Sequence, residues 1–136
     1  PLLQSSAASD VYKRQTYDFI DSQNIYHGGA ISPGIRMRYS SFSNYTSNLP
    51  LLKFQDITKI IGANTEESLH IGVNNGIVGE INQYISSLKK SHSKFNVIIT
   101  GGDSIFLLNK IKNAIFADQD FLAFGLNYII KLNEGD

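Results

Sequence analysis

Two glycine-rich segments of this chain are the residues best suited to binding a ligand. The first is Gly-Gly-Ala-Ile-Ser-Pro-Gly at 28–34, and the second is Thr-Gly-Gly-Asp at 100–103. The first comes after the apolar stretch 16–21, and the second directly follows the strand-like run 95–99. Glycines at strand ends let a backbone approach a phosphate, a sugar or a small substrate closely. The two segments therefore predict a cleft that is lined from two sides.

Each segment also has an interpretation that needs no ligand. Gly28 and Gly29 would weaken a strand interior, which indicates either a bulged hairpin strand or a close ligand approach. Residues 100–103 join a strand to a helix, where outward backbone N–H groups suit a ligand oxygen or a ribose. A plain tight turn would have a similar sequence, so both alternatives stay open.

The titratable side chains near the first segment give no complete catalytic set. His27 could act as a general base, but the sequence offers it no evident carboxylate partner, so we expect a surface or partly packed histidine. Asp18 and Asp21 are three residues apart in a strand and so face opposite sides. We expect them to be a site-edge residue and a turn residue. Thr65 has a sufficient structural role as a helix N-cap.

Composition excludes several classes of protein. The 136 residues carry twelve basic and twelve acidic side chains, so no charge field indicates nucleic acid or an anionic membrane as a partner. The absence of cysteine excludes disulfides and cysteine-bound zinc, and the histidines His27, His70 and His92 lack metal-ligand spacing. With no apolar run near the length of a membrane helix and no secretion signal, we expect a cytoplasmic location.

The common nucleotide and hydrolase motifs are also missing from the sequence. It contains no phosphate-binding loop ending in Gly-Lys-Ser/Thr, no Gly-x-Gly-x-x-Gly run and no Gly-x-Ser-x-Gly elbow. Any nucleotide site must therefore be of another type.

The elements that would position these residues follow from hydrophobic periodicity. The expected order is strand, strand, helix, helix, strand, helix, helix, which is an α/β or α+β pattern. The first two strands form a hairpin. The elements are strands 16–21 and 25–32, a helix from Pro33 that ends before 48–50, a helix over 65–90, a strand over 95–99, a helix after Asp103, and a helix over 121–132.

The same periodicity predicts the buried faces of the helices. We expect three glycines of the long helix, Gly72, Gly76 and Gly79, to permit close packing of another element. The predicted buried residues are Ile35, Met37, Tyr39, Phe42 and Tyr45 in the first helix, Leu69, Val73, Ile77, Ile81, Tyr84 or Ile85, and Leu88 in the long helix, and Ile105, Leu108, Ile111 and Ile115 after Asp103.

Residues 1–15 differ in character from the rest of the chain. They have no clear period, and the strand after them begins without turn residues. The stretch resembles translated adapter or vector sequence, so we expect a non-native, disordered leader at 1–15 and a single domain over 16–136. A natural disordered tail is the alternative.

Five segments, taken in order, resemble the type III pantothenate kinase family. They are residues 16–18, 28–34, 61–68, 100–103 and 120–127, and the likeness covers 16–133. The resemblance implies an α/β, actin-like and ribonuclease H-like nucleotidase fold of the acetate and sugar kinase superfamily. It also implies that this chain is the C-terminal domain of a two-domain protein.

The resemblance implies roles for particular residues. The family phosphorylates pantothenate with ATP, the first step toward coenzyme A. ATP, magnesium and a monovalent cation, potassium or ammonium, are the implied cofactors, and a homodimer with its pantothenate pocket near the subunit interface is the implied assembly. The implied nucleotide contacts are Thr16, Thr100, Gly101 and Gly102, and the implied pantothenate contacts are Gly28, Gly29, Ile31, Pro33, Gly34 and Thr65.

Parts of the family pattern are absent from this sequence. The family's Asp-Gly-Asn-Thr phosphate loop is missing, as is the Gly-x-Asp-Arg segment whose aspartate is the general base. The Asp-x-Gly-Thr run expected before Thr16 is replaced by Ser-Asp-Val-Tyr-Lys-Arg-Gln at 9–15. We therefore expect no catalytic residue, no metal ligand and no kinase activity in this chain alone.

Two other functions stay open at this point. One is a non-enzymatic accessory factor for transcription from the same family, for which contact with another protein fits the neutral charge better than contact with DNA. The other is a relative of the sugar and acetate kinases, which the pattern at 28–34 makes a weaker interpretation.

Overall fold

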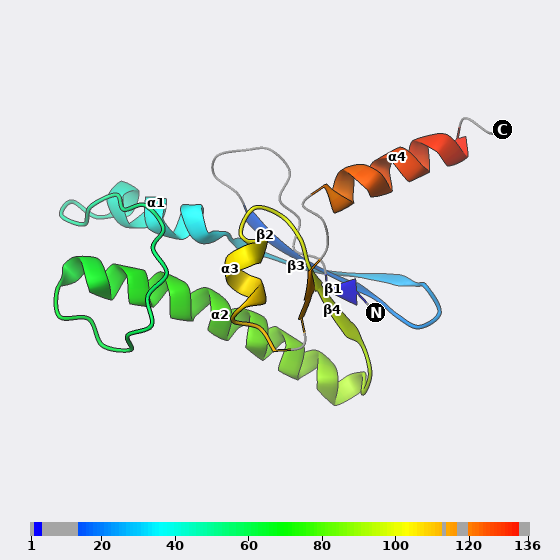
Figure 1. The fold of residues 1–136 in the computed structure, drawn as a ribbon, viewed down its shortest axis with the longest axis horizontal. Coiled ribbons are helices and arrows are strands. Elements are labelled where there is room, and N and C mark those ends of the chain that lie inside the picture. The colour runs from blue at the N-terminus through cyan, green and yellow to red at the C-terminus, as the bar shows by residue number, and fades with distance from the viewer. Residues whose placement is uncertain (1, 4–13, 113, 117–119, 134–136) are drawn as a thin grey trace.

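The chain forms an α/β structure in which one long helix supports two small sheets (Figure 1). The computed structural model describes residues 2–3, 14–112, 114–116 and 120–133. The elements are β1 (Leu2–Leu3), β2 (Arg14–Ile20), β3 (Tyr26–Pro33), α1 (Ile35–Tyr45), α2 (Thr65–Ser91), β4 (Asn96–Ile99), α3 (Ser104–Leu108), β5 (Ala114–Phe116) and α4 (Phe121–Asn133). One sheet is the antiparallel pair β2–β3, and the other is parallel with the order β1-β4-β5.

A bulge in the β2–β3 hairpin accounts for both of its glycines. The register shifts between Asp18 and Ile20, so that β3 carries an extra residue there. Gly28 lies in the bulge with φ +80°, a left-handed conformation that favours glycine. A Cβ on Gly29 would lie 1.6 Å from the Tyr17 carbonyl oxygen of the facing strand. The bulged-strand interpretation therefore explains this pair without a ligand.

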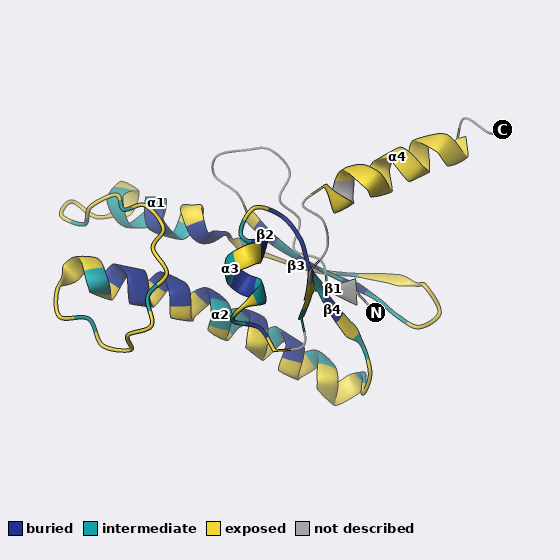
Figure 2. Cartoon of the chain, in the orientation of Figure 1, coloured by how far each residue is buried: buried dark blue, intermediate teal, exposed yellow. Residues whose placement is uncertain are grey.

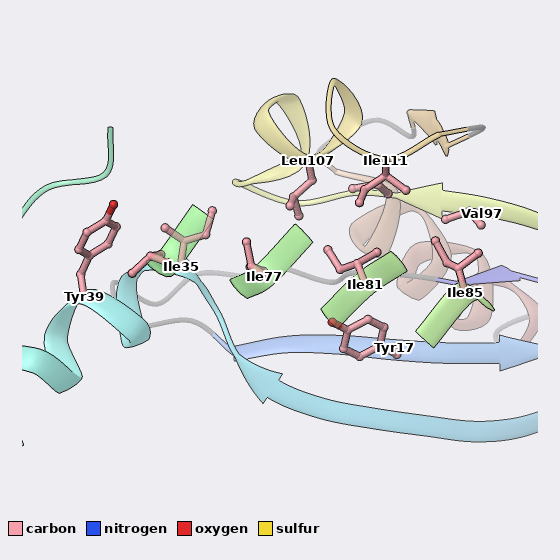
Figure 3. Packing of buried hydrophobic residues seen from close by; sticks show 11 residues of the cluster. Tyr17, Ile35, Tyr39, Ile77, Ile81, Ile85, Val97, Leu107 and Ile111 are labelled. Carbon is pink, nitrogen blue, oxygen red and sulfur yellow. The ribbon is translucent and has the colours of Figure 1, made fainter. Parts of the chain in front are cut away.

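The hydrophobic core lies along one stripe of α2, as the periodicity predicts (Figures 2 and 3). Leu69, Val73, Ile77, Ile81 and Ile85 are buried, and Ile77 is fully inaccessible to solvent. Figure 3 shows Ile77, Ile81 and Ile85 side by side along the helix. Each such side chain contributes about 1.5–3 kcal/mol on burial. The other residues of the cluster come from both sheets, from α1 and from the segment around α3, and they are Tyr17, Ile35, Tyr39, Val97, Ile99, Leu107 and Ile111.

The buried face of α1 is narrower than predicted. Ile35 and Tyr39 are buried, and Phe42 packs against them at the next turn. Met37 is 37% exposed, because two helical residues after Ile35 a side chain points to the opposite side. Tyr45, the last residue of the helix, is 87% exposed. The predictions of burial for Met37 and Tyr45 are wrong.

The start of α2 differs from the prediction by one residue. Asn64 is the N-cap, and its side-chain oxygen accepts a hydrogen bond from the Glu67 backbone N–H at 2.9 Å. Asparagine is at least as good an N-cap as threonine, so Asn64 and Thr65 were both suitable, and the structure uses Asn64. Thr65 is instead the first helical residue, and it is exposed.

The predicted close packing at the three α2 glycines is also wrong within the described chain. A Cβ on Gly72 or Gly79 would meet no atom within 4 Å. A Cβ on Gly76 would meet only a guanidinium nitrogen of Arg38 at 3.7 Å. All three glycines lie on the exposed side of the helix.

The segment after β4 contains a short strand that the apolar periodicity did not predict. The helix predicted after Asp103 ends at Leu108 and does not extend to Ile115. Ile115 lies in β5, where it is 49% exposed. Ile105 is 64% exposed, so its predicted burial is wrong as well, whereas Ile111 is buried as predicted. Asp103 stands at the N-cap position of α3, but its side chain makes no capping hydrogen bond.

Four residues of the expected leader have a described structure. Leu2 and Leu3 pair in parallel with the first residues of β4, and Arg14 and Gln15 begin β2. Gln15 is buried at 4% exposure. The expected disorder is therefore wrong for these four residues, while the rest of 1–15 lies outside the described residues. The non-native origin of this stretch stays a prediction.

Candidate functional site

One of the predicted nucleotide-binding residues, Thr16, lines a crevice, and the others directly follow a strand that borders it. A narrow crevice between β2 and β4 is lined by Thr16 from one strand and Ile99 from the other. Thr100 directly follows Ile99 and is 2% exposed. Thr16 therefore lies near the strand end that the 100–103 turn follows, whereas the predicted cleft between segments 28–34 and 100–103 stays a prediction.

The 100–103 turn is held by its own backbone. The Gly101 carbonyl accepts a hydrogen bond from the Ser104 N–H at 3.1 Å, and Gly101 is buried with φ +101°. Gly102 is exposed, and a Cβ there would meet nothing within 4 Å. The Ser104 hydroxyl oxygen is buried and has no hydrogen-bond partner among the residues that the structure describes. The turn thus combines a closed inner side with an accessible backbone at Gly102.

A carboxylate on α2 fixes the end of β3 and the beginning of α1. Glu80 accepts hydrogen bonds from the Tyr17 hydroxyl at 2.5 Å and the Ser32 hydroxyl at 2.5 Å. Its other oxygen accepts from Arg38 Nη2 at 2.6 Å. Arg38 Nε also donates to the Pro33 carbonyl at 2.8 Å. One partly buried carboxylate therefore connects β2, β3, α1 and α2 at the glycine-rich 28–34 segment.

The network shifts the acidity of its two titratable members in opposite directions. Burial by itself would raise the pKa of Glu80, but hydrogen bonds from Ser32, Tyr17 and Arg38, with the Arg38 charge, outweigh it and hold the pKa below its usual value. Burial, followed by the hydrogen bond to Glu80 and its charge, raises the pKa of Tyr17 well above its usual value. At neutral pH the network is a carboxylate held by neutral hydroxyls and one guanidinium.

His27 has a carboxylate partner after all. Its Nε2 lies 2.7 Å from an Asp21 carboxylate oxygen, because the hairpin turn folds the two residues together. The other Asp21 oxygen accepts the backbone N–H groups of Gln23 at 2.8 Å and Ile25 at 2.9 Å, which confirms Asp21 as the turn residue. The hydrogen bond with His27, followed by that from Ile25, lowers the pKa of Asp21. Asp18 accepts instead from the Tyr26 hydroxyl at 2.8 Å.

The beginning of α2 borders an open cleft of about 560 Å³. The cleft is lined by residues 55–59 on one side and by Asn64, Glu66 and His70 on the other. His70 is 3% exposed, and its Nδ1 lies 2.6 Å from the Tyr39 hydroxyl. Thr65 is an exposed residue of the first turn of α2 and is not among the residues that line this cleft.

Thr65 is not brought to the other predicted substrate residues. Glu80, which holds Ser32, lies fifteen residues further along the same helix. At about 1.5 Å per residue this separates Thr65 from Glu80 by roughly 22 Å. The structure therefore divides the predicted pantothenate contacts into two groups, 28–34 near the middle of α2 and Thr65 at its beginning (Figure 1).

Several residues of this arrangement were missed by the sequence reasoning. They are Glu80 with Ser32 and Arg38, and the buried pair His70 and Tyr39. One signal was available, since Glu80 is the only acidic residue of α2 after its first turn. It stands three residues after the buried Ile77 and so borders the core stripe.

Together these features define an α/β domain with glycine-rich segments at its strand ends and a polar network behind one of them. The model of the type III pantothenate kinase family matches residues 15–87. A type III pantothenate kinase from Flavobacterium psychrophilum is 50% identical over 112 residues, which cover 82% of this chain and 46% of that protein. One from Phocaeicola vulgatus is 40% identical and covers 88% of this chain and 49% of that protein.

A solved structure is also similar to this chain. A crystal structure from Campylobacter jejuni, named as a candidate Baf family transcriptional activator, matches with a TM-score of 0.68 and 26% identity over 99% of this chain and 58% of that one. The chain belongs to the type III pantothenate kinase family. It spans about half the length of the relatives it matches.

Proposed function

We propose that this chain is part of an ATP-dependent pantothenate kinase. The reaction would transfer the γ-phosphoryl group of ATP to pantothenate and give 4′-phosphopantothenate, the first step of coenzyme A biosynthesis. The observation that carries the proposal is the 50% identity to a type III pantothenate kinase across 82% of this chain. The α/β architecture with a parallel sheet supports the finer proposal of an actin-like nucleotidase fold, of which this is the C-terminal domain.

The geometry supports a division of labour between the strand ends. Thr16 lines the narrow crevice between β2 and β4, and residues 100–102 directly follow β4, so we assign the adenosine part of ATP to these strand ends. Residues 28–34 would form a wall of the pantothenate site, and the Glu80 network would keep that wall rigid behind Ser32 and Pro33. A rigid wall holds a substrate in position, which is most of what phosphoryl transfer requires of a protein.

A homodimer would explain the separate position of Thr65. Within one chain, Thr65 lies roughly 22 Å along α2 from the Glu80 network. A pantothenate pocket close to a subunit interface would let Thr65 of a second copy reach it. The exposure of Thr65 and of neighbouring Ile60 and Ile61 supports this arrangement, since such side chains are typical of a covered surface.

We expect the rest of the catalytic equipment to lie outside this chain. Among the residues that the structure describes, no group of three or more histidines, aspartates and glutamates could hold a metal ion. The general base and phosphate loop of the family pattern are absent from the sequence. We therefore assign no magnesium or monovalent-cation ligand to these residues, and we expect ATP turnover only in the presence of the half of the protein that this chain does not match.

The proposal is tested by restoring that half. The chain is co-produced with the part of the Flavobacterium psychrophilum relative that it does not match, and 4′-phosphopantothenate is measured by mass spectrometry after adding pantothenate, ATP and magnesium. We expect product from the pair and none from either part alone. A folded, associated pair that forms no product contradicts the proposal.

A variant pair at Thr65 tests the assigned substrate contact in the restored enzyme. Thr65→Ala should raise the KM for pantothenate about tenfold, roughly the loss of one hydrogen bond of ~1.4 kcal/mol, and leave the KM for ATP unchanged. Thr65→Ser keeps the hydroxyl and serves as the matched control with a near-normal KM. Equal behaviour of the two variants would remove Thr65 from the site.

The structural neighbour gives a reason to keep a second function. The Campylobacter jejuni protein is named as a candidate transcriptional activator. The same co-production assay separates the alternatives, because an accessory factor would associate with a protein partner without forming product.

A further inference from the structure

The two faces of the β2–β3 hairpin have different surroundings. Gln15, Tyr17 and Phe19 alternate along β2 and are buried, and successive side chains of a strand point to opposite faces. These three therefore form an inner face. Tyr17 on this face packs against Tyr84 of α2 with ring centroids 4.7 Å apart, and Figure 3 shows it between β2 and α2. Thr16, which lies between two of them in the sequence, belongs to the outer face, which turns away from α2.

The register of the hairpin places two assigned residues side by side on the outer face. Thr16 pairs with Ile31 in the antiparallel ladder, and Ile31 is 72% exposed. Side chains directly opposite each other share a face of the sheet. Ser32 pairs with Gln15 and so stands on the inner face, toward α2. A residue that we assign to ATP and one that we assign to pantothenate are therefore cross-strand neighbours.

Glu80 binds both strands from the inner face at this point. Its Oε1 accepts hydrogen bonds from the Tyr17 hydroxyl at 2.5 Å and the Ser32 hydroxyl at 2.5 Å. These donors directly follow the two outer-face neighbours in the sequence, one on each strand. The Oε2 atom accepts from Arg38 Nη2 at 2.6 Å, so the carboxylate is itself held in place. A single oxygen atom therefore fixes the two strands to each other and to α2.

We propose that Glu80 is a positioning residue for both substrates, which sets the relative placement of Thr16 and Ile31 from the inner face. Glu80 touches neither of them and acts through Tyr17 and Ser32. Substrates must be held close to the reactive geometry, and a displacement of about 1 Å can cost about a hundredfold in rate. This inference rests on the proposed function, because the roles of Thr16 and Ile31 come from it.

The test measures each ligand separately on the co-produced pair described above. Calorimetry gives the Kd for pantothenate and the Kd for a non-hydrolysable ATP analogue. Glu80→Gln should weaken the binding of both ligands at least about fivefold. Tyr17→Phe keeps the ring and should weaken mainly the ATP analogue, whereas Ser32→Ala should weaken mainly pantothenate. A general loss of structure would weaken both ligands alike, so the separation of the two effects reports positioning.

Double variants and a control sharpen the result. If both hydroxyls act through Glu80, adding Tyr17→Phe or Ser32→Ala to Glu80→Gln should change either Kd by less than about twofold. Asp56→Asn is the matched control, because it removes a carboxylate from an ion pair with Lys110 that does not involve the hairpin. It should leave both Kd values within about twofold of wild type. Circular dichroism checks folding, and the two hydroxyl variants still test the proposal if Glu80→Gln does not fold.

Three results would overturn the proposal. They are unchanged Kd values in folded Glu80→Gln, an equal loss of both ligands in each hydroxyl variant, and a wild-type pair that binds neither ligand. Unchanged Kd values beside normal formation of 4′-phosphopantothenate would contradict this proposal alone. A wild-type pair that binds both ligands without forming product would contradict the proposed activity alone, and the variants would still decide the role of Glu80.

Discussion

Glu80 is the residue at which the β2–β3 hairpin, α1 and α2 meet. Its carboxylate accepts hydrogen bonds from Tyr17, Ser32 and Arg38, so removing the charge affects three elements at once. Hydrogen bonds to a charged group contribute more than neutral ones, about 1.5–3 kcal/mol each at most, and partial exposure reduces this figure. A single carboxylate therefore connects parts of the chain that are distant in the sequence.

Glu80→Gln should reduce the free energy of unfolding at pH 7 by about 1–2 kcal/mol. The pKa of Glu80 is lower in the folded chain than its usual 4.5, so the ionised side chain stabilises the fold above that value. This stabilisation is lost as the pH falls through the lower, folded pKa. The difference between wild type and variant should therefore shrink below about pH 4.5, in urea unfolding measured from pH 7 to pH 3.

A matched control for this measurement lies on the same helix. Glu66→Gln removes a carboxylate that is 64% exposed and 3.9 Å from His70, and it should change stability by only a few tenths of a kcal/mol. If the difference in stability between wild type and Glu80→Gln stays constant across the pH range, the charge is not what stabilises the network.

At the scale of elements, α2 contributes the most residues to the core and is the element predicted most accurately. Its 27 residues repeat a three- and four-residue apolar spacing many times, so its ends were placed within about one residue. β5 has three residues and β1 two, and such short segments carry no period of their own. Their pairing with β4 is parallel and non-local, so nothing in the neighbouring sequence indicates it.

The same reasoning explains which parts of the site could be predicted. The glycine-rich segments are contiguous, and their turns are readable from a few residues. The partners of Glu80 precede it by 63, 48 and 42 positions in the sequence, and only the folded arrangement of the hairpin and helices brings them together. The sequence predicted the turn between Asp21 and His27, but it did not predict the contact between their side chains.

Gly79→Ala should stabilise the chain by about 0.5–1 kcal/mol. Position 79 is inside α2 and exposed, and a Cβ there would meet nothing within 4 Å, so alanine removes the helix cost of glycine without a clash. Thermal unfolding measures the gain. Gly29→Ala is the contrasting variant and should destabilise strongly, because its Cβ would lie 1.6 Å from the Tyr17 carbonyl oxygen. A loss of stability or of dimer with Gly79→Ala would show that another chain packs on this side of α2.

At the scale of the whole molecule, the exposed apolar side chains of α4 leave much of the chain's burial incomplete. A domain whose terminal helix lies in water gains less from folding than its composition allows. The chain and the half that it does not match should therefore stabilise each other through binding.

Adding that half should raise the melting temperature of the chain in a concentration-dependent way. Binding to the folded state alone adds about 2.7 kcal/mol when the partner is at 100 times its Kd, which corresponds to several degrees for a domain of this size. Differential scanning fluorimetry over a partner titration measures the shift. A melting temperature that ignores partner concentration would mean that the folded chain does not bind it.

The separation of the two sheets has a consequence for cooperativity. No ladder joins β2–β3 to β1-β4-β5 among the described residues, although β1 lies close to β2, and side chains of both sheets pack on α2. Local opening in proteins follows such boundaries, so each sheet can exchange its amide protons as a separate foldon while α2 keeps the highest protection. The long helix is then the part of the molecule whose loss turns two partial openings into global unfolding.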